Sequence, residues 1–295
     1  MQLTLANGKP IRGDIIKSFI LRYDMSPVPA TLEAEIRVDD ELRKQLGEGK
    51  VINANGDDFR IIKPVGTVDN KTQGSHDISI LHITALLESC YSVAFVRQRA
   101  IIKENSVLTE IYRAAGATIK AVDGDFYAGR FTCMNGETPS FHIARLLQDE
   151  GGVVRWRNGK LQFFRLADLF KQKPSLDLPN NAAEDIVSGF LERHEIPSFY
   201  STAPDGSIIY GNRLKARSAK FAPGKNLQQL QNMSRCLVQR KVTKIPYHPS
   251  LRAGDLINFV GAEPLSIVTV AHVFIPGIDA GGAEQYSKLW LSGIG

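Results

Sequence analysis

The sequence predicts a mainly β protein of the α+β class, with two similar antiparallel β-barrel (tube) domains and a small α+β domain inserted between them. Three observations lead to this prediction: alternating apolar residues near the N-terminus, two capped helices in the middle of the chain, and an internal repeat. The composition agrees, because 43% hydrophobic and 23% charged residues are ordinary for a globular protein. A chain of 295 residues usually divides into about two domains.

Residues 1–103 are predicted to form the first β-barrel domain. Residues 31–38 alternate polar and apolar side chains at a period of two, which sends one set to each face of a strand. Further along, Asn55-Gly56 separates two apolar segments, and this dipeptide favours the positive φ angles of a tight hairpin turn. We therefore expect antiparallel strands in this region.

Residues 104–178 are predicted to form the inserted α+β domain. Ser106 is placed to cap a first helix, and Gly116 stands where a left-handed residue would end it. Thr138, followed by a proline, is placed to cap a second helix that ends at Gly151. The repeated use of a capping residue and a terminal glycine predicts two short helices.

The second β-barrel domain is predicted to cover residues 179–295, after a polar connector with prolines at 173–181. Just before this connector, Asn158-Gly159 predicts a hairpin that completes the inserted domain. Within the last domain, Pro204-Asp205-Gly206 predicts a turn between two strands. The apolar run 265–274 suits a strand covered on both faces.

The first and last regions share a short repeat at a fixed offset of 205 residues. Over residues 46–62 and 251–267, six positions are identical: Leu46 and Leu251, Gly49 and Gly254, Ile52 and Ile257, Asn53 and Asn258, Gly56 and Gly261, Ile62 and Ile267. Ordinary residue usage would supply about one identity. We interpret the repeat as a duplicated strand-turn-strand unit in which the four glycines form barrel turns.

Positive charge is concentrated in one segment, which we call the basic tract. Between Gly206 and Gly254 there are ten Lys and Arg residues and no Asp or Glu, although the whole chain carries only +5. A strand at Arg213, Lys215 and Arg217 would project a cationic row from one face. With Lys220, this row is the predicted partner interface. A channel lining and a solvated edge strand are the other interpretations.

The sequence shows no motif of a catalytic, cofactor-binding or metal site. Six histidines lie outside ligand spacings: His76, His82, His142, His194, His248 and His272. Three distant cysteines predict buried thiols in a reducing compartment: Cys90, Cys133 and Cys236. Asp123-Gly124-Asp125 fits a hairpin turn better than a cation site. We therefore predict no enzyme, no cofactor and no metal, and the lack of a long apolar run predicts no membrane insertion.

Three stretches resemble a known family. Residues 249–257 contain a Leu-Arg-x-Gly-Asp turn and are followed by a strand that ends near His272. Residues 140–152 are similar to a family helix that precedes a β-hairpin, and residues 106–116 are similar to the helix that opens the inserted domain. These stretches are similar to the baseplate hub proteins of contractile phage tails, which are related to late-control protein D and to the N-terminal part of the type VI secretion spike protein VgrG.

This resemblance implies a homotrimer whose six barrels form a pseudo-sixfold ring. Such a ring would join the sixfold tail tube to the threefold central spike and line the channel. The implied partners are the protein itself, a tail tube or tube-initiator protein, the central spike protein and a tape measure protein, with DNA only in transit. The implied location is the tail baseplate of a virion, assembled in the host cytoplasm, and a non-contractile tail is also compatible.

Two other functions stay open from the sequence. A nucleic-acid-binding β-barrel protein would use the basic tract, although Tyr210, Phe221 and Tyr247 are few and are not spaced for base stacking. A peptidoglycan-degrading or other hydrolytic component is disfavoured, because the sequence lacks the motifs of such enzymes.

Overall fold

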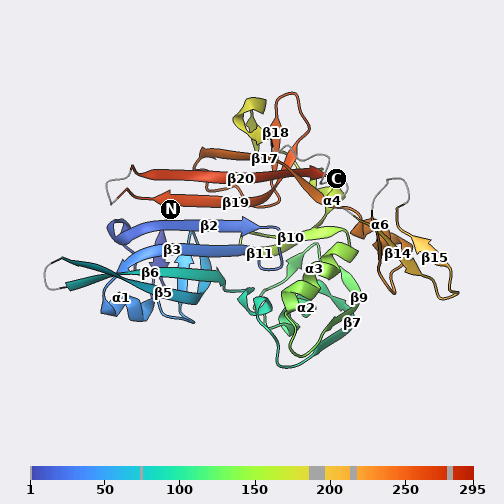
Figure 1. Cartoon of the computed structure of the whole chain (residues 1–295), viewed down its shortest axis with the longest axis horizontal. Helices are drawn as coiled ribbons and strands as arrows, with labels where there is room; N and C mark the ends of the chain where they lie inside the picture. Colours follow the sequence, from blue (N-terminus) through green and yellow to red (C-terminus); the bar gives the residue numbers. More distant parts are fainter. Residues whose placement is uncertain (1, 74–75, 186–196, 213–217, 278–281) are drawn as a thin grey trace.

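One large sheet, to which the first and last parts of the chain both contribute, forms the body of the molecule (Figure 1). Among the described residues this sheet has twelve strands, and three smaller sheets accompany it. The chain is therefore mainly β with short helices, as the sequence predicts. The computed structural model describes residues 2–73, 76–185, 197–212, 218–277 and 282–295.

The first half of the large sheet has the strand order β1-β4-β5-β6-β3-β2, and all neighbouring strands in it are antiparallel. Buried and more exposed residues alternate along β3, which confirms the period-two prediction. The elements of this half are β1 (Leu3–Leu5), η1 (Gly13–Ile15), β2 (Ile16–Asp24), β3 (Ala30–Val38), α1 (Asp40–Gln45), β4 (Val51–Ala54), β5 (Asp57–Gln73) and β6 (His76–Leu87).

The second half of the sheet repeats this arrangement. Its strand order is β18-β19-β20-β17-β13, and the corresponding strands of the first half are β4-β5-β6-β3-β2. If the five strands of each half are numbered from 1 to 5 along the chain, both halves have the order 3-4-5-2-1. The five strands pair antiparallel in both halves, and β12 adds to β18 in parallel. The elements are β12 (Leu176–Leu178), η3 (Asn180–Ala182), β13 (Glu184–Asp185), β17 (Leu237–Pro246), β18 (Leu256–Phe259), β19 (Leu265–Ile275) and β20 (Glu284–Ile294).

The hairpins β4–β5 and β18–β19 have the same structure at their open ends. Gly49 and Gly254 precede the hairpins with φ angles of 76° and 83°. The Gly49 N–H donates to the Ile61 carbonyl at 2.8 Å, and the Gly254 N–H donates to the Ile267 carbonyl at 2.7 Å. Glycine is favoured at both positions because residues with a β-carbon rarely adopt these φ angles.

The turn of the second hairpin is one residue longer than that of the first. Ile52 pairs with a residue seven positions further on, whereas Ile257 pairs with a residue eight positions further on. The second strands of the two hairpins therefore correspond at an offset of 206. The predicted match of Ile62 with Ile267 was wrong by one residue, because a comparison without gaps cannot include the longer turn.

Both second strands also contain a β-bulge at the corresponding residue. The register of β5 against β6 shifts at Ile62, and the register of β19 against β20 shifts at Val268. A bulge bends its strand and is a specified feature of a sheet rather than a defect. Its presence in both halves supports the duplication independently of the sequence identities.

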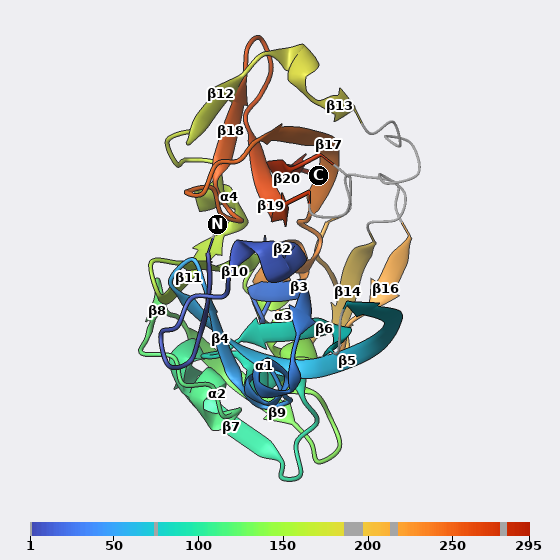
Figure 2. The ribbon, with the colours of Figure 1, turned by 90° about the vertical axis from the view of Figure 1, so that its left-hand side faces the viewer.

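Strands β2 and β19 join the two halves into one sheet. They pair antiparallel from Asp24, opposite Thr269, to Phe19, opposite Phe274. The Thr269 hydroxyl donates to Asp24 Oδ1 at 2.5 Å, and the rings of Phe19 and Phe274 lie 5.4 Å apart. Figure 2 shows the two halves on either side of this seam.

The described strands form open sheets, so the prediction of two closed barrels was wrong. Closing a barrel would pair the strands at the two edges of each half. Instead β2, at the edge of the first half, pairs with β19 of the second half. The backbone groups at this edge are therefore satisfied by the other half of the chain, which removes the need for closure.

The middle of the chain contains the predicted helices and hairpin. Asn158 and Gly159 connect β10 to β11 with φ angles of 52° and 71°, which confirms the hairpin turn. Thr138 is the N-cap of α3, and Gly151 follows the end of that helix at positive φ. The elements are η2 (Tyr91–Ala94), β7 (Ile101–Val107), α2 (Leu108–Ala114), β8 (Val122–Asp123), β9 (Tyr127–Cys133), α3 (Pro139–Asp149), β10 (Gly152–Arg157), β11 (Lys160–Arg165) and α4 (Leu166–Leu169).

The predicted cap of the first inserted helix was wrong. Ser106 lies within β7, and Val107 is at the N-cap position of α2. The Asp125 carboxylate instead accepts hydrogen bonds from the Thr109 backbone N–H at 3.3 Å and from the Thr109 hydroxyl at 2.6 Å. The segment 123–125 is therefore not a hairpin turn: β8 pairs in parallel with β11, and the loop after it caps α2.

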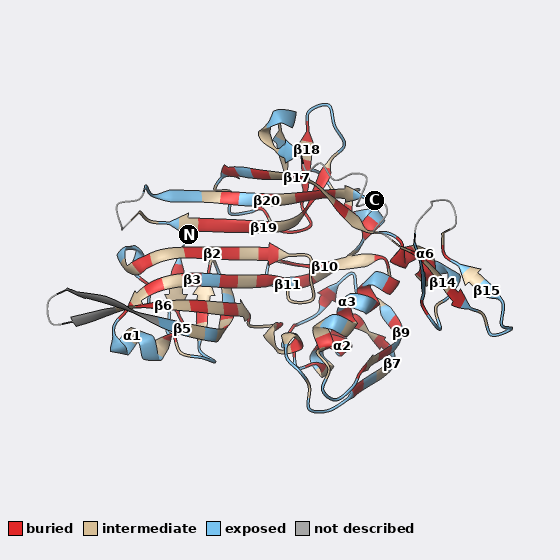
Figure 3. Ribbon diagram, viewed as in Figure 1, coloured by how far each residue is buried: buried red, intermediate tan, exposed pale blue. Residues whose placement is uncertain are grey.

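Most buried apolar side chains belong to one core that includes residues of the first, middle and last parts of the chain, and Figure 3 shows buried residues in all three parts. Phe19 and Phe59 belong to it from the first part, Tyr112 and Trp156 from the middle, and Leu289 from the last part. The predicted division into three domains stays a prediction. Among the described residues, no helix is long and apolar enough to cross a lipid bilayer.

Candidate partner-binding site

Lys220 is the one member of the predicted partner interface that lies within the described residues. It is exposed on β16 (Ala219–Phe221). Arg213, Lys215 and Arg217 fall outside the described residues. Lys220 belongs to a small three-stranded sheet that projects from one end of the molecule (Figure 1).

This small sheet has the order β15-β14-β16 and packs against helix α6. The predicted turn joins β14 to β15, with Gly206 at a φ of 84°. Asn226 and Gln229 form a reciprocal capping box at the start of α6, which fixes where the helix begins. One face of the sheet is buried against the helix through Phe199, Ile209, Ala222, Leu230 and Met233. The elements are β14 (Ser198–Thr202), β15 (Ile208–Tyr210) and α6 (Leu227–Met233).

The opposite face of this sheet carries three aromatic side chains in a row. Tyr200 pairs with Tyr210 on one neighbouring strand and with Phe221 on the other. Its ring centroid lies 5.7 Å from that of Tyr210 and 5.4 Å from that of Phe221. Phe221 is 51% exposed, and Ile208, on the same face, is 53% exposed. We call Tyr200, Tyr210 and Phe221 the aromatic row.

Tyr210 and Phe221 are eleven residues apart, and this spacing does not predict a shared surface. Strand register brings them together through Tyr200. The turn at 204–206 contained a usable signal, since a tight hairpin around it places Tyr200 opposite Tyr210. Nothing local predicts the parallel pairing of β14 with β16. An exposed aromatic surface of this kind is typical of a partner-binding site.

Hydrogen bonds hold the small sheet and its helix against α3. The Lys225 ammonium donates to Asp149 Oδ2 at 2.6 Å, and the Asn232 side-chain amide donates to the Asp149 carbonyl at 2.9 Å. The Gln148 side-chain amide donates to the Met233 carbonyl at 3.3 Å. Asp149 and Asn232 are buried, so the position of the aromatic row relative to α3 is well specified.

Several cationic side chains in the described part of the basic tract contact acids or backbone carbonyls rather than forming a shared surface. Three lysines of the tract form ion pairs with acids outside it: Lys225 with Asp149, Lys241 with Asp185, and Lys244 with Glu284. Arg252 donates to the carbonyls of Pro249 and Leu251 and lies 4.2 Å from the centroid of the Tyr23 ring. Part of the expected self-repulsion within the tract is therefore offset inside one chain.

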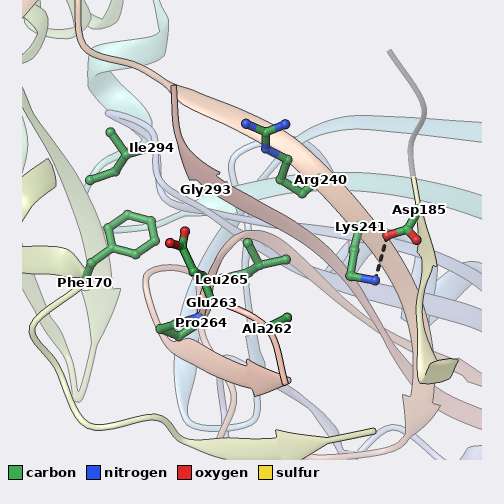
Figure 4. Close-up of a pocket in the computed structure, with 10 residues that line it drawn as sticks. All are labelled: Phe170, Asp185, Arg240, Lys241, Ala262, Glu263, Pro264, Leu265, Gly293 and Ile294. Atoms are coloured by element: carbon green, nitrogen blue, oxygen red, sulfur yellow. Dashed lines mark ion pairs between the residues drawn. The ribbon is translucent and has the colours of Figure 1, made fainter. Parts of the chain in front are cut away.

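A pocket of about 930 Å³ lies beside β17 and the β18–β19 turn (Figure 4). Its wall combines the aromatic ring of Phe170 with the charged side chains of Arg240 and Glu263. Lys241, also in the wall, is held by Asp185 at 2.6 Å. The described lining residues include no Ser, Thr, Cys or His.

Two serines contact histidines, but neither contact by itself makes a catalytic site. The Ser287 hydroxyl donates to His272 Nδ1 at 2.8 Å, while His272 Nε2–H donates to the Leu251 carbonyl at 3.2 Å. Ser287 and His272 are both fully buried, so a substrate cannot reach them. Ser250 Oγ lies 3.1 Å from His248 Nδ1 on an exposed turn. Nucleophilic catalysis would also need a substrate cleft and donors for the oxyanion.

Strand β10 connects the inserted part to both halves of the large sheet. The Trp156 indole N–H donates to Asp57 Oδ1 at 2.8 Å, in the β4–β5 hairpin. From the opposite face of the strand, Arg155 and Arg157 contact Asp255, just before β18, with Arg155 Nη1 3.3 Å from Asp255 Oδ1. Burial lowers the pKa of the Arg155 guanidinium, and the Asp255 carboxylate opposes this shift. We call Arg155, Arg157 and Asp255 the buried clamp.

Comparisons with known proteins find solved structures with a similar fold, but no match at the level of sequence families. No protein-family model matches the chain, and no curated protein sequence matches it. The 43 kDa tail protein of prophage MuSo2 from Shewanella oneidensis is similar over 98% of this chain and 96% of its own, with 14% identity and a TM-score of 0.62. A tail protein from Neisseria meningitidis is similar over 99% and 95%, with 12% identity and a TM-score of 0.64.

A third similar structure comes from type VI secretion. It is an Escherichia coli component of that system, which exhibits structural similarity to T4 bacteriophage tail proteins gp27 and gp5. It covers 99% of this chain and 76% of its own, with 9% identity and a TM-score of 0.57. The chain therefore has the fold of phage tail proteins and of a type VI secretion component.

Proposed function

We propose that this chain is a structural protein of a phage-like tail, namely the hub that joins a sixfold tail tube to a threefold central spike. The duplication carries this proposal, because one chain contains the same five-strand arrangement twice. Three copies of such a chain supply six similar units. A ring of this composition matches six subunits on one side and three on the other. The fold shared with phage tail proteins supports the assignment.

In this proposal the protein acts by assembly and not by catalysis. Residues 1–103 and 179–295 are the two sheet domains, and residues 104–178 are the inserted domain. The partners are two further copies of the chain, a tail tube or tube-initiator protein, the central spike protein and a tape measure protein. DNA passes through the channel, and the hub belongs to the tail baseplate of a virion assembled in the host cytoplasm.

The small sheet supplies the proposed contact with a neighbouring tail protein. The aromatic row would form the apolar centre of this contact. Lys220 precedes Phe221 on β16 and lies on the opposite, helix-facing side of the sheet beside Phe199. With Arg213, Lys215 and Arg217, it would supply positive charge at the edge of the contact. Aromatic side chains contribute most at the desolvated centre of an interface, while charges at its rim steer association. We therefore propose an acidic partner surface for this contact.

A homotrimer is the first expectation of this proposal. Light scattering on the purified protein should give three times the chain mass of 32.6 kDa, about 98 kDa, at micromolar concentration. Electron microscopy of the same sample should show threefold rings with six similar lobes. Particles with the mass of one chain, folded without a partner protein, would contradict the hub proposal.

Binding of single-stranded nucleic acid is the second candidate function, and the aromatic row is the observation that favours it. Bases stack on exposed aromatic rings, and each stacked base contributes about 1–3 kcal/mol. If this function holds, Tyr200→Ala should weaken binding of a labelled single-stranded DNA at least about 5-fold, and binding should fall steeply with salt.

The hub proposal expects no such binding at physiological salt. Fluorescence anisotropy of the labelled DNA distinguishes the two functions. Tyr127→Ala is the matched control, because Tyr127 is 75% exposed on β9, which belongs to a different sheet. Tight, salt-sensitive binding that Tyr200→Ala weakens and Tyr127→Ala leaves unchanged would replace the hub proposal by the second candidate.

A further inference from the structure

Cys133, Glu137 and His142 form a cluster between the end of β9 and the start of α3. One potential ligand atom from each residue lies within 4.8 Å of those of the other two. Strand β9 and helix α3 pack side by side (Figure 1). We propose that these three side chains bind a zinc ion and that the ion links the strand end to the helix.

Backbone structure holds the three residues of the cluster close to one another. Cys133 is fixed at the end of β9, where it pairs with Ile101 of β7. A tight turn follows, in which the Glu137 N–H donates to the Met134 carbonyl at 3.2 Å. The Met134 N–H donates to Glu137 Oε2 at 2.6 Å and so orients the carboxylate. A ligand carboxylate held by a hydrogen bond of this kind is typical of metal sites.

Neighbouring aromatic rings restrict the imidazole of His142. His142 lies in α3, soon after the N-cap Thr138, and its ring meets those of Phe131 and Phe141 edge to face at 6.5 Å and 5.5 Å. Its Nε2 lies 3.0 Å from Glu137 Oε2. The imidazole and the carboxylate are therefore already together, with the Cys133 sulfur beside them.

The ligand set matches the chemistry of zinc. Zinc prefers thiolate, imidazole and carboxylate ligands in a tetrahedral arrangement. With ordinary zinc–ligand lengths, atoms bound to one ion are about 3.3–3.6 Å apart. The imidazole nitrogen and the carboxylate oxygen are 3.0 Å apart, and no separation among the three ligand atoms exceeds 4.8 Å, so side-chain shifts of about 1 Å would suffice.

Three protein ligands leave one coordination position for water. The thiolate of Cys133 and the carboxylate of Glu137 together balance the charge of the zinc ion. The backbone of Arg97 bonds to Glu137 and Gly136, and the positive charge of this nearby residue disfavours a bound cation. We therefore expect weaker binding than in a closed four-ligand site. The spacing of the three residues matches no familiar zinc motif, so the cluster is not evident from the sequence, and the turn at 134–137 brings the residues together.

Zinc binding is measured on the full chain, purified, freed of metal with a chelator and titrated with zinc. We expect one equivalent of zinc per chain and a rise in thermal stability on addition. Cobalt(II) in place of zinc should give the near-ultraviolet charge-transfer absorption of a cobalt–thiolate bond. Cys133→Ser should remove this absorption and weaken zinc binding at least about 100-fold, because loss of even an outer partner of a metal ligand costs about 10–100-fold.

Cys236→Ser is the matched control, since this cysteine follows α6 in the chain, does not belong to the cluster and should leave binding unchanged. His142→Ala is the second variant if Cys133→Ser does not fold, because the His142 side chain is partly exposed. The proposal is overturned if the wild type and the cluster variants bind zinc equally, or if cobalt gives no thiolate absorption.

Discussion

Replacing Asp255 with asparagine should lower the free energy of unfolding by about 3–5 kcal/mol, because it leaves the buried Arg155 guanidinium without its carboxylate partner. The side chains of Asp255 and Arg155 are only 4% and 7% exposed. Water cannot solvate the uncompensated charge without opening the contact between β10 and the second half of the sheet. Denaturant unfolding at a fixed protein concentration measures the loss.

Two further variants test whether burial causes this loss. Asp168→Asn breaks the exposed Lys171–Asp168 pair, and we expect a change below about 1 kcal/mol there. Arg155→Met combined with Asp255→Leu removes both buried charges and should recover most of the stability. Equal losses from Asp255→Asn and Asp168→Asn would show that the buried clamp does not stabilise the fold.

The fully buried His272 should make the protein less stable as the pH falls from about 6.5 to about 4. Burial, with a smaller effect of Arg252, lowers the pKa of His272 from 6.5 to about 4. Between these pH values His272 is protonated in the unfolded chain but neutral in the folded chain. The free energy of unfolding therefore rises with pH. At 1.36 kcal/mol per pH unit, the full effect is about 3 kcal/mol.

Comparing the wild type with His272→Gln isolates this titration from those of other groups. The glutamine variant has its own packing cost, but that cost does not depend on pH. The wild type should therefore lose about 3 kcal/mol relative to the variant between pH 7 and pH 4, measured as free energy of unfolding at each pH. Parallel stability curves for the two proteins would rule out His272 as the titrating group.

Local features of the fold were predictable because their causes are local. Asn55-Gly56 and Asn158-Gly159 adopt the positive φ angles that hairpin turns require. Thr138 begins α3 because the proline after it suits the first turn of a helix. The short repeat at Gly49 and Gly254 predicted a duplication that proves to include five strands in each half.

Features that depend on distant residues could not be predicted in the same way. Asp125 replaces Ser106 as the cap of α2, across a separation that no capping rule covers. The prediction of closed barrels was wrong because β2, an edge strand of the first half, pairs with β19 of the second half. The aromatic row depends on the register of three strands, and the cluster of Cys133 depends on one turn. In each case the missing information was tertiary pairing, which propensity and periodicity do not contain.

The seam between β2 and β19 has a consequence for biosynthesis. Asp24 and Thr269 are 245 residues apart, so the ribosome completes β2 long before it makes the strand that covers it. Until then the growing chain carries an uncovered strand edge, which can recruit other nascent chains into unwanted sheets. Contacts between such distant segments also slow folding. Chains released early, before β19, should therefore aggregate, and holdase chaperones should bind the nascent protein for most of its synthesis.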